Sequence, residues 1–211
     1  MIPTIEDYPH PSVDTVPLTR ANWTLDPTKA ALLIHDMQEY FTSAYRGNDT
    51  INRTTANIAR LIDCARKANI PVFYTAQPPN QRAEDRGLLT DLWGTGLSAD
   101  GREAIVEALT PQAEDTVLTK WRYDAFERSD FQQLLGDSGR TQLIITGIYA
   151  HIGVLSTALS AFMKDISPFL VADACADFSE DLHRFALAQA ARTCAVVTDT
   201  AAVTKALSAT H

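Results

Sequence analysis

Six short apolar runs, separated by segments long enough for helices, constrain the fold more than any other feature of this sequence. Continuous apolar runs of this length are typical of strands that are covered on both faces, as in parallel sheets. We therefore predict six buried strands, at residues 30–35, 71–75, 116–119, 142–146, 168–172 and 195–198.

Helical periodicity is visible in the segments between these runs. In residues 50–68, apolar side chains such as Ile51, Ile58 and Ile62 recur at spacings of three and four, which predicts an amphipathic helix. Similar patterns predict helices at 152–164 and after Ser179. Alternating strands and helices require crossover connections. The predicted fold class is therefore α/β, with three layers: a six-stranded, mostly parallel sheet and helices on both faces.

The chain length and the prolines near the start predict the domain organisation. A length of 211 residues suits one domain, so we expect a single domain over residues 1–211. Five prolines in residues 1–28 predict an extended N-terminal arm. The sequence ends shortly after the last predicted strand, and we expect no carrier domain.

Charge and cysteine content narrow the partners and the compartment. A net charge of −8 without a local Lys/Arg cluster argues against nucleic acid and anionic membranes as partners. An anionic substrate would need cations placed inside a pocket. Three widely spaced cysteines suggest neither a disulfide framework nor a metal site, and no apolar stretch reaches membrane-spanning length. We expect a cytoplasmic protein without a metal or other cofactor.

Opposite charges follow two of the predicted strands. Asp36 follows the first strand and Lys120 the third, and the carboxyl ends of parallel strands form the usual ligand edge. Taken singly, Asp36 also suits a helix N-cap or a surface turn, and Lys120 a surface position. Together they favour a shared site. His35 points to the other side of the strand, so we interpret it as a hydrogen-bonded core residue.

Residues 147–158 run from a strand end directly into a helix. Backbone N–H groups at such a helix start can bind an anion or a polar oxygen. Gly153 would let a ligand approach the backbone, or it serves helix–sheet packing. Tyr149 suits either a pocket wall or the core.

Residues 76–101 are too long and too rich in Gly and Pro for a plain connection, which favours a lid or binding loop. Gln77, Arg86 and Trp93 could supply a hydrogen bond, a carboxylate clamp and an aromatic lid. A salt bridge from Arg86 to Glu84 or Asp85 is the simpler interpretation from these residues alone. Trp93 could equally anchor the loop to the core.

These motifs, taken together, resemble the isochorismatase family. The resemblance runs from the proline-rich arm to residue 198, and it includes the isochorismatases of catecholate siderophore pathways and the 2-amino-2-deoxyisochorismate hydrolases of phenazine pathways. It rests on LLIHDMQEYF, YTAQP, EDRGLL, LWGTGL, LTKWRY, GIYAHIGV and VADACADFS, in the family's order and spacing.

The resemblance implies a set of site residues. Asp36 would be the general acid and Lys120 a second catalytic residue. It also implies a cis peptide bond between Ile148 and Tyr149, a homodimer and no cofactor. The residues implied to bind substrate are Phe41, Gln77, Arg86, Trp93, Tyr149 and Gly153.

The implied reaction is hydrolysis of the vinyl ether of isochorismate to pyruvate and 2,3-dihydro-2,3-dihydroxybenzoate. The alternative is the same chemistry on 2-amino-2-deoxyisochorismate, giving trans-2,3-dihydro-3-hydroxyanthranilate. Related cysteine hydrolases such as nicotinamidases have a nucleophilic cysteine where this chain has Gly153. An amidase that uses Cys64, Cys175 or Cys194 and a non-catalytic scaffold are the remoter alternatives.

Overall fold

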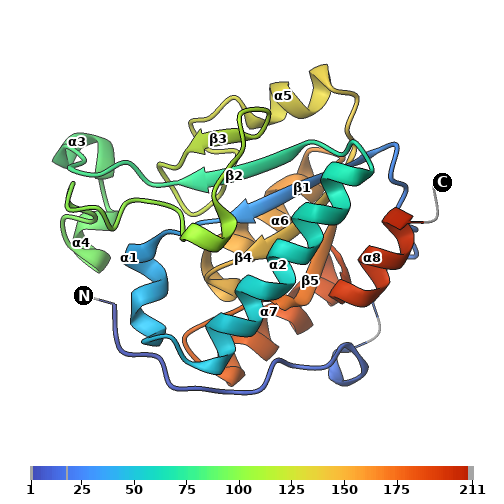
Figure 1. Cartoon of the computed structure of the whole chain (residues 1–211), viewed down its shortest axis with the longest axis horizontal. Coiled ribbons are helices and arrows are strands. Elements are labelled where there is room, and N and C mark those ends of the chain that lie inside the picture. Colours follow the sequence, from blue (N-terminus) through green and yellow to red (C-terminus); the bar gives the residue numbers. More distant parts are fainter. Residues whose placement is uncertain (1, 18, 209–211) are drawn as a thin grey trace.

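A six-stranded parallel sheet forms the centre of the molecule (Figure 1). The computed structural model describes residues 2–17 and 19–208. The strand order is β3-β2-β1-β4-β5-β6, and every neighbouring pair is parallel. All six predicted strands are confirmed. Their bounds are β1 Ala30–His35, β2 Val72–Ala76, β3 Thr116–Thr119, β4 Gln142–Gly147, β5 Ser167–Cys175 and β6 Val196–Thr198.

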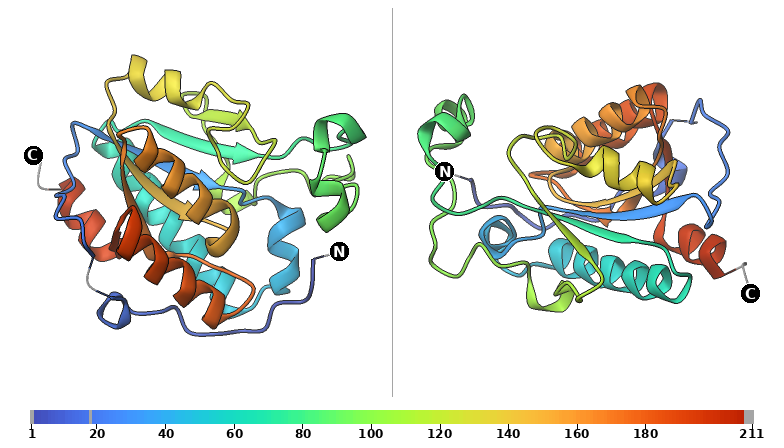
Figure 2. Two further views of the ribbon diagram at one scale, coloured as in Figure 1. Left: turned by 180° about the vertical axis from the view of Figure 1, so that it is seen from behind. Right: turned by 90° about the horizontal axis from the view of Figure 1, so that it is seen from above.

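Helices cover both faces of this sheet, which confirms the three-layer arrangement (Figure 2). On one face lie α2 (Asp49–Lys67) and α8 (Thr200–Ser208), and on the other α5 (Phe131–Asp137), α6 (Leu155–Met163) and α7 (Glu180–Thr193). Alternate residues of β1 enter the two cores: Leu32 packs on the α2 face and Leu33 on the α6 face. A strand buried on both sides has no polar face, which is why its sequence is a continuous apolar run.

The predicted helices form at the expected places, with defined starts. The Asn48 side chain accepts the Ile51 N–H at the start of α2, and Ser179 accepts the Leu182 N–H at the start of α7. The predicted helix at 152–164 begins later than expected, because a π-helical turn, Ala150–Val154, precedes α6. Helices that the sequence analysis did not predict are α1 (Glu39–Thr42), α3 (Ala83–Arg86), α4 (Leu89–Trp93), α5 and α8.

The N-terminal arm runs along the outside of the molecule (Figure 1). Within residues 2–17 and 19–28 it contains one short 3-10 turn, Val13–Thr15, and is otherwise extended or irregular. Tyr8 attaches it to the body, because its ring is buried and its N–H donates to the Thr50 hydroxyl. No helix in the described part of the chain is both long and apolar enough to cross a membrane.

The topology places a ligand crevice at one edge of the sheet. The chain moves outward from β1 through β2 to β3, and then returns to add β4 on the other side of β1. Ligands of open α/β sheets bind beyond the carboxyl ends of the strands at such a reversal point. The segment with α3 and α4 lies beyond that edge (Figure 1).

Packing of α2 on the sheet provides a stability test. Ile58 is fully buried in the core, whereas Arg60 is exposed on the same helix. Ile58→Ala is expected to lower the free energy of unfolding by about 2–5 kcal/mol, because it leaves a cavity. Arg60→Ala is the matched control and should change it by less than about 0.5 kcal/mol. Urea unfolding measures both, and equal effects would contradict this account of the core.

Candidate active site

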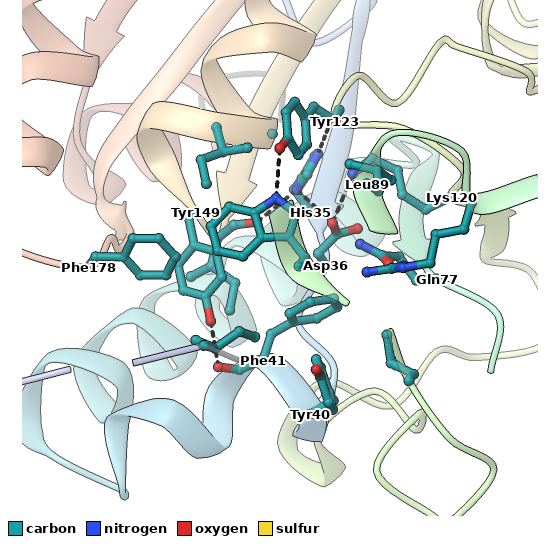
Figure 3. A pocket seen from close by; sticks show the side chains of 17 residues that line it. His35, Asp36, Tyr40, Phe41, Gln77, Leu89, Lys120, Tyr123, Tyr149 and Phe178 are labelled. Atoms are coloured by element: carbon teal, nitrogen blue, oxygen red, sulfur yellow. Dashed lines mark hydrogen bonds and ion pairs between the residues drawn. The ribbon is translucent and has the colours of Figure 1, made fainter. Parts of the chain in front are cut away.

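A pocket opens at the carboxyl edge of β1, β2, β3 and β4 (Figure 3). It is lined by every site residue inferred from the sequence: Asp36, Phe41, Gln77, Arg86, Trp93, Lys120, Tyr149 and Gly153. The sequence analysis did not assign His35, Tyr40, Leu89, Leu97, Tyr123 or Phe178 to the pocket, although they also line it.

A buried ion pair lies in this pocket. Lys120 Nζ is 2.8 Å from Asp36 Oδ2, and the two residues are only 2% and 7% exposed. The surface interpretations of both residues are therefore wrong. Asp36 follows β1 in the left-handed region, with φ of 51°, and Lys120 is held after β3 by its N–H, which donates to the Ala76 carbonyl.

Thr75 binds Asp36 twice and is a site residue that the sequence analysis missed. Its hydroxyl donates to Asp36 Oδ1 at 2.6 Å and accepts the Asp36 N–H at 3.0 Å. Thr75 belongs to β2 and is fully buried, next to β1 in the sheet. The sequence does show a hydroxyl residue near the end of the second predicted strand. Its contact with Asp36 can be inferred only when the two strands are known to be neighbours in the sheet.

The electrostatic balance keeps Asp36 ionised in the free protein. Burial alone would raise its pKa. The charge of Lys120 and the hydrogen bonds from Lys120 and Thr75 outweigh burial and hold the pKa of this carboxyl below its ordinary value. The pocket therefore contains a carboxylate and an ammonium in contact, with little access to water.

His35 fills the space beside Gly153. Its Nδ1 is 2.8 Å from the Ile148 carbonyl oxygen and its Nε2 is 3.2 Å from the Tyr123 carbonyl oxygen. These contacts confirm a buried, hydrogen-bonded histidine, and burial, with the charge of Lys120, lowers its pKa to about 4. A Cβ at Gly153 would overlap the His35 ring. No side chain fits at position 153 while His35 keeps this place.

Aromatic side chains form one wall of the pocket (Figure 3). The Tyr149 hydroxyl donates to the Phe41 carbonyl at 2.9 Å, and the Tyr149 ring contacts Phe41 and Phe178. The Tyr149 hydroxyl already donates its proton to the Phe41 carbonyl, so its oxygen can only accept a hydrogen bond from a substrate. The peptide bond from Ile148 to Tyr149 is cis, as the resemblance implied.

The helix start after Tyr149 is less available to an anion than the sequence suggested. The Ala150 N–H donates to the Ala176 carbonyl, and the His151 N–H donates to Asp177 Oδ2. Two of the amides expected to face a ligand are therefore already used. The side chains, and above all the cations, must supply the recognition of an anion.

Arg86 is buried at the pocket, and the salt bridge expected from the neighbouring acids is absent from its described contacts. Arg82 makes those ion pairs, with Glu84 and Asp85. Arg86 is 4% exposed and its Nε donates to the Gly94 carbonyl. Within residues 2–17 and 19–208, its Nη1 has no hydrogen-bond partner. A buried guanidinium nitrogen without a partner is suited to receive an anionic ligand.

The loop residues Gln77 and Trp93 are held in different ways. The buried side chain of Gln38 accepts the Gln77 N–H at 2.7 Å and donates to the Gln77 carbonyl at 3.0 Å, which fixes its backbone at the pocket. The Trp93 Nε1–H donates to the Tyr123 hydroxyl at 2.7 Å, so the indole closes the loop over the site. Gln38 is a supporting residue that the sequence analysis missed.

The cysteines lie elsewhere. None of Cys64, Cys175 and Cys194 lines the described pocket, and Cys175 and Cys194 are buried. Burial raises the pKa of the Cys175 thiol, which makes it a poor nucleophile. Among the described residues, no group of three His, Cys, Asp or Glu side chains is arranged to hold a metal ion.

The domain model for the isochorismatase domain matches residues 30–202, which include the whole sheet and the pocket's ion pair. The chain belongs to the isochorismatase family. It is 53% identical over 188 residues to enterobactin synthase component B of Escherichia coli strain K12, a match that covers 88% of this chain and 66% of that protein. It is 50% identical over 202 residues to the isochorismatase of Bacillus subtilis strain 168, covering 94% of this chain and 65% of the relative.

A third relative matches along nearly its whole length. The phenazine biosynthesis protein PhzD of Pseudomonas fluorescens is 47% identical over 201 residues, covering 94% of this chain and 96% of PhzD. This chain thus spans slightly less than two thirds of the length of the first two relatives, and nearly the whole length of PhzD.

Solved structures share the fold. A cysteine hydrolase from Pseudomonas syringae pv. phaseolicola 1448A superposes with a TM-score of 0.83 at 23% identity, covering 93% of this chain and 100% of that chain. An isochorismatase family protein from Burkholderia thailandensis gives a TM-score of 0.75 at 27% identity, covering 88% and 98%. The first comparison, at its low identity, concerns the fold alone.

The contact between His35 and Gly153 predicts a position-specific effect. Gly153→Ala is expected to lower the free energy of unfolding by about 1–3 kcal/mol, because the new methyl group overlaps the imidazole. The control is Gly136→Ala in α5, where a Cβ meets open space, and it should be neutral or stabilising by up to about 1 kcal/mol.

Combining Gly153→Ala with His35→Ala separates this overlap from other causes. The double variant should lose less stability than the sum of the two single variants, because the methyl group then has room. Thermal or urea unfolding of the four proteins measures the difference. Strict additivity would show that the ring and the methyl group do not compete for this space.

Proposed function

We propose that the protein hydrolyses the vinyl ether of isochorismate, releasing pyruvate and 2,3-dihydro-2,3-dihydroxybenzoate. The observation that carries this proposal is the buried pair of Asp36 and Lys120 in a pocket whose position 153 has no room for a nucleophile. Amide hydrolysis by this fold would need such a nucleophile, whereas a vinyl ether needs only a proton at carbon and then water. The names of the relatives, isochorismatase among them, support this choice.

The proposed reaction begins with a proton from Asp36 to the terminal methylene carbon of the enolpyruvyl group. The π electrons form the new C–H bond, which leaves an oxocarbenium ion. Water adds to that carbon and gives a hemiketal. The hemiketal collapses to pyruvate and the ring alcohol, so no covalent bond to the protein forms.

Cations in the pocket suit a substrate with two carboxylates. We assign Arg86 to one carboxylate, because its Nη1 has no partner in the described part of the chain. We assign Lys120 to the other, since its ammonium can donate to a ligand while it stays in contact with Asp36. Gln77 would bind a ring or ether oxygen.

The aromatic residues have a separate task in this proposal. Phe41, Trp93 and Tyr149 would form the apolar walls around the ring, and Gly153 would present its backbone to the substrate. Excluding water from these walls strengthens the electrostatic interactions at Asp36. The Tyr149 hydroxyl would take part only as an acceptor.

A second candidate substrate is 2-amino-2-deoxyisochorismate, which would give trans-2,3-dihydro-3-hydroxyanthranilate and pyruvate. The near full-length match to PhzD, a phenazine biosynthesis protein, favours it. The two substrates differ in one ring substituent, and the proposed proton transfer is the same for both.

We also propose that the protein acts in the cytoplasm as a homodimer. Three cysteines that form no disulfide suit a reducing compartment. Exposed apolar side chains on α6 and α7, including Phe162, Met163 and Phe185, offer a surface that a second copy could cover. Light scattering at several protein concentrations tests the dimer, and a monomer throughout would contradict it.

Replacement of the acid tests the proposed chemistry. Asp36→Asn keeps the shape but removes the transferable proton, so pyruvate release is expected to fall by roughly 10²-fold or more. Asp63→Asn, on the exposed face of α2, is the control and should keep full turnover. A coupled lactate dehydrogenase assay with each substrate measures pyruvate. If the native protein releases none from either substrate, the proposed function is wrong and a non-catalytic role is favoured.

The carboxylate clamp has its own test. Arg86→Lys keeps a positive charge but loses the two-pronged geometry, so KM is expected to rise while kcat changes less. Arg86→Ala should raise KM further. Steady-state kinetics at fixed pH measures both constants. Unchanged KM in both variants would remove Arg86 from substrate binding.

A further inference from the structure

The two oxygens of the Asp36 carboxylate have different partners. Oδ1 accepts the Thr75 hydroxyl proton at 2.6 Å, and Oδ2 accepts from Lys120 Nζ at 2.8 Å. The same Thr75 oxygen accepts the Asp36 N–H at 3.0 Å. The hydroxyl therefore has one acceptor position filled by the backbone, and its only proton is directed at Oδ1.

This arrangement decides which oxygen can carry a proton. A proton on Oδ1 would face the Thr75 proton, and no other acceptor for that hydroxyl is present among the described contacts. Oδ2 has no such conflict. It lies next to the ammonium of Lys120, which is itself a proton donor.

We propose that Lys120 is the source of the transferred proton, which passes through Oδ2 of Asp36 to the substrate carbon, while Thr75 confines the transfer to that oxygen. The proposal rests on the proposed function and deepens it. Lys120 and Asp36 act as one acid, and Thr75 is a positioning residue that does not touch the substrate.

The steps balance without an external acid. An N–H bond of Lys120 breaks and an Oδ2–H bond forms, which leaves a neutral amine whose two remaining N–H bonds can still donate to the substrate carboxylate. The Oδ2–H bond then breaks as the C–H bond forms at the methylene carbon, and its electron pair stays on Asp36. Water adds to the oxocarbenium ion and releases a proton, which returns through Oδ2 to Lys120. The hemiketal hydroxyl proton moves to the leaving ring oxygen as the C–O bond breaks.

This route requires the charge balance at Asp36 to change when substrate binds. In the free protein the pKa of Asp36 is held below its ordinary value, which disfavours a proton on this carboxyl whatever its source. The buried ion pair already contains a transferable proton. Excluding water on substrate binding weakens the solvation of both charges and favours the neutral form of the pair.

Other charged and titratable groups face the pair. From β1, His35 Nδ1 lies 3.7 Å from Asp36 Oδ2, and its pKa of about 4 leaves it neutral in the neutral range. Tyr149 faces Asp36 from the segment after β4, and burial raises its pKa, so it also stays neutral. Asp124, whose pKa burial raises, interacts electrostatically with Lys120. Neither His35 nor Tyr149 changes charge between mildly acidic and mildly alkaline pH.

The pH dependence of kcat/KM tests the proton source. Native protein should show a constant kcat/KM across the neutral range, until hydroxide removes the proton that the pair shares. A native kcat/KM that falls in proportion to proton concentration across this range would mean that Asp36 takes its proton from solvent. That result would overturn the proposal.

Removal of the amine gives the complementary result. In Lys120→Met, Asp36 must be protonated by solvent, so kcat/KM should be low and should fall as the pH rises through the neutral range. Lys29→Met, which changes a largely exposed lysine, is the matched control and should keep the native profile. A Lys120→Met profile as constant as the native one would contradict the role of Lys120.

Variants of Thr75 test the direction of transfer. Thr75→Val keeps the shape without the hydroxyl, and its kcat should fall roughly tenfold, the scale of one hydrogen bond to a charged group, with KM little changed. Thr75→Ser retains the hydroxyl and should recover most of the native kcat. Circular dichroism measures the folded fraction of each variant. If both variants keep the native kcat per folded molecule, Thr75 has only a structural role, and the inference that it confines the proton transfer to Oδ2 is wrong.

A measurement on the free protein separates this inference from the proposed function. Carbon-13 NMR of the Asp36 carboxyl should show it ionised through the neutral range in native protein, and protonated at higher pH in Lys120→Met than in native protein. This needs no substrate. Absent pyruvate release would refute the proposed function, whereas a native Asp36 that is protonated at neutral pH would refute the inference alone.

Discussion

The rest of the site depends on one constraint, the burial of a carboxylate and an ammonium in contact. Two charges removed from water are tolerated only when they pair well and their remaining polar atoms are satisfied. Asp36 and Lys120 meet this condition through the 2.8 Å contact between them and the hydrogen bond from Thr75. The parallel sheet makes it possible, because β1, β2 and β3 end at the same edge and deliver the three side chains to one point.

The neighbouring features follow from protecting this pair and leaving room for an anionic ligand. His35 fills the space beside position 153, so this pocket position has no room for a side chain. The loop after β2 brings Arg86 to the pocket, where its buried Nη1 has no hydrogen-bond partner within residues 2–17 and 19–208. Gly96 allows this, because a Cβ there would overlap the Arg86 guanidinium. The overall negative charge of the protein is thus compatible with an anion bound inside.

Much of the fold was predictable because buried parallel strands are continuous apolar runs. Residues 30–35 and 116–119 were predicted with the observed bounds. The late start of α6 could not be predicted, because the π-helical turn before it continues the same apolar pattern. Thr75 was missed because its contact with Asp36 depends on β1 lying beside β2, and the strand order is not readable from local sequence. Arg86 seemed suited to a surface ion pair because Glu84 and Asp85 adjoin it, but the path of the loop gives both acids to Arg82.

The central claim is that the buried pair delivers a proton to carbon, and isotopic labelling tests it most directly. Turnover of isochorismate in D₂O, with rapid trapping of the product as lactate, allows mass spectrometry to locate the new hydrogen. Carbon protonation by exchangeable protons of Asp36 and Lys120 predicts one deuterium in the methyl group of each pyruvate released. Pyruvate trapped without deuterium in its methyl group would contradict the account, whichever residue was thought to supply the proton.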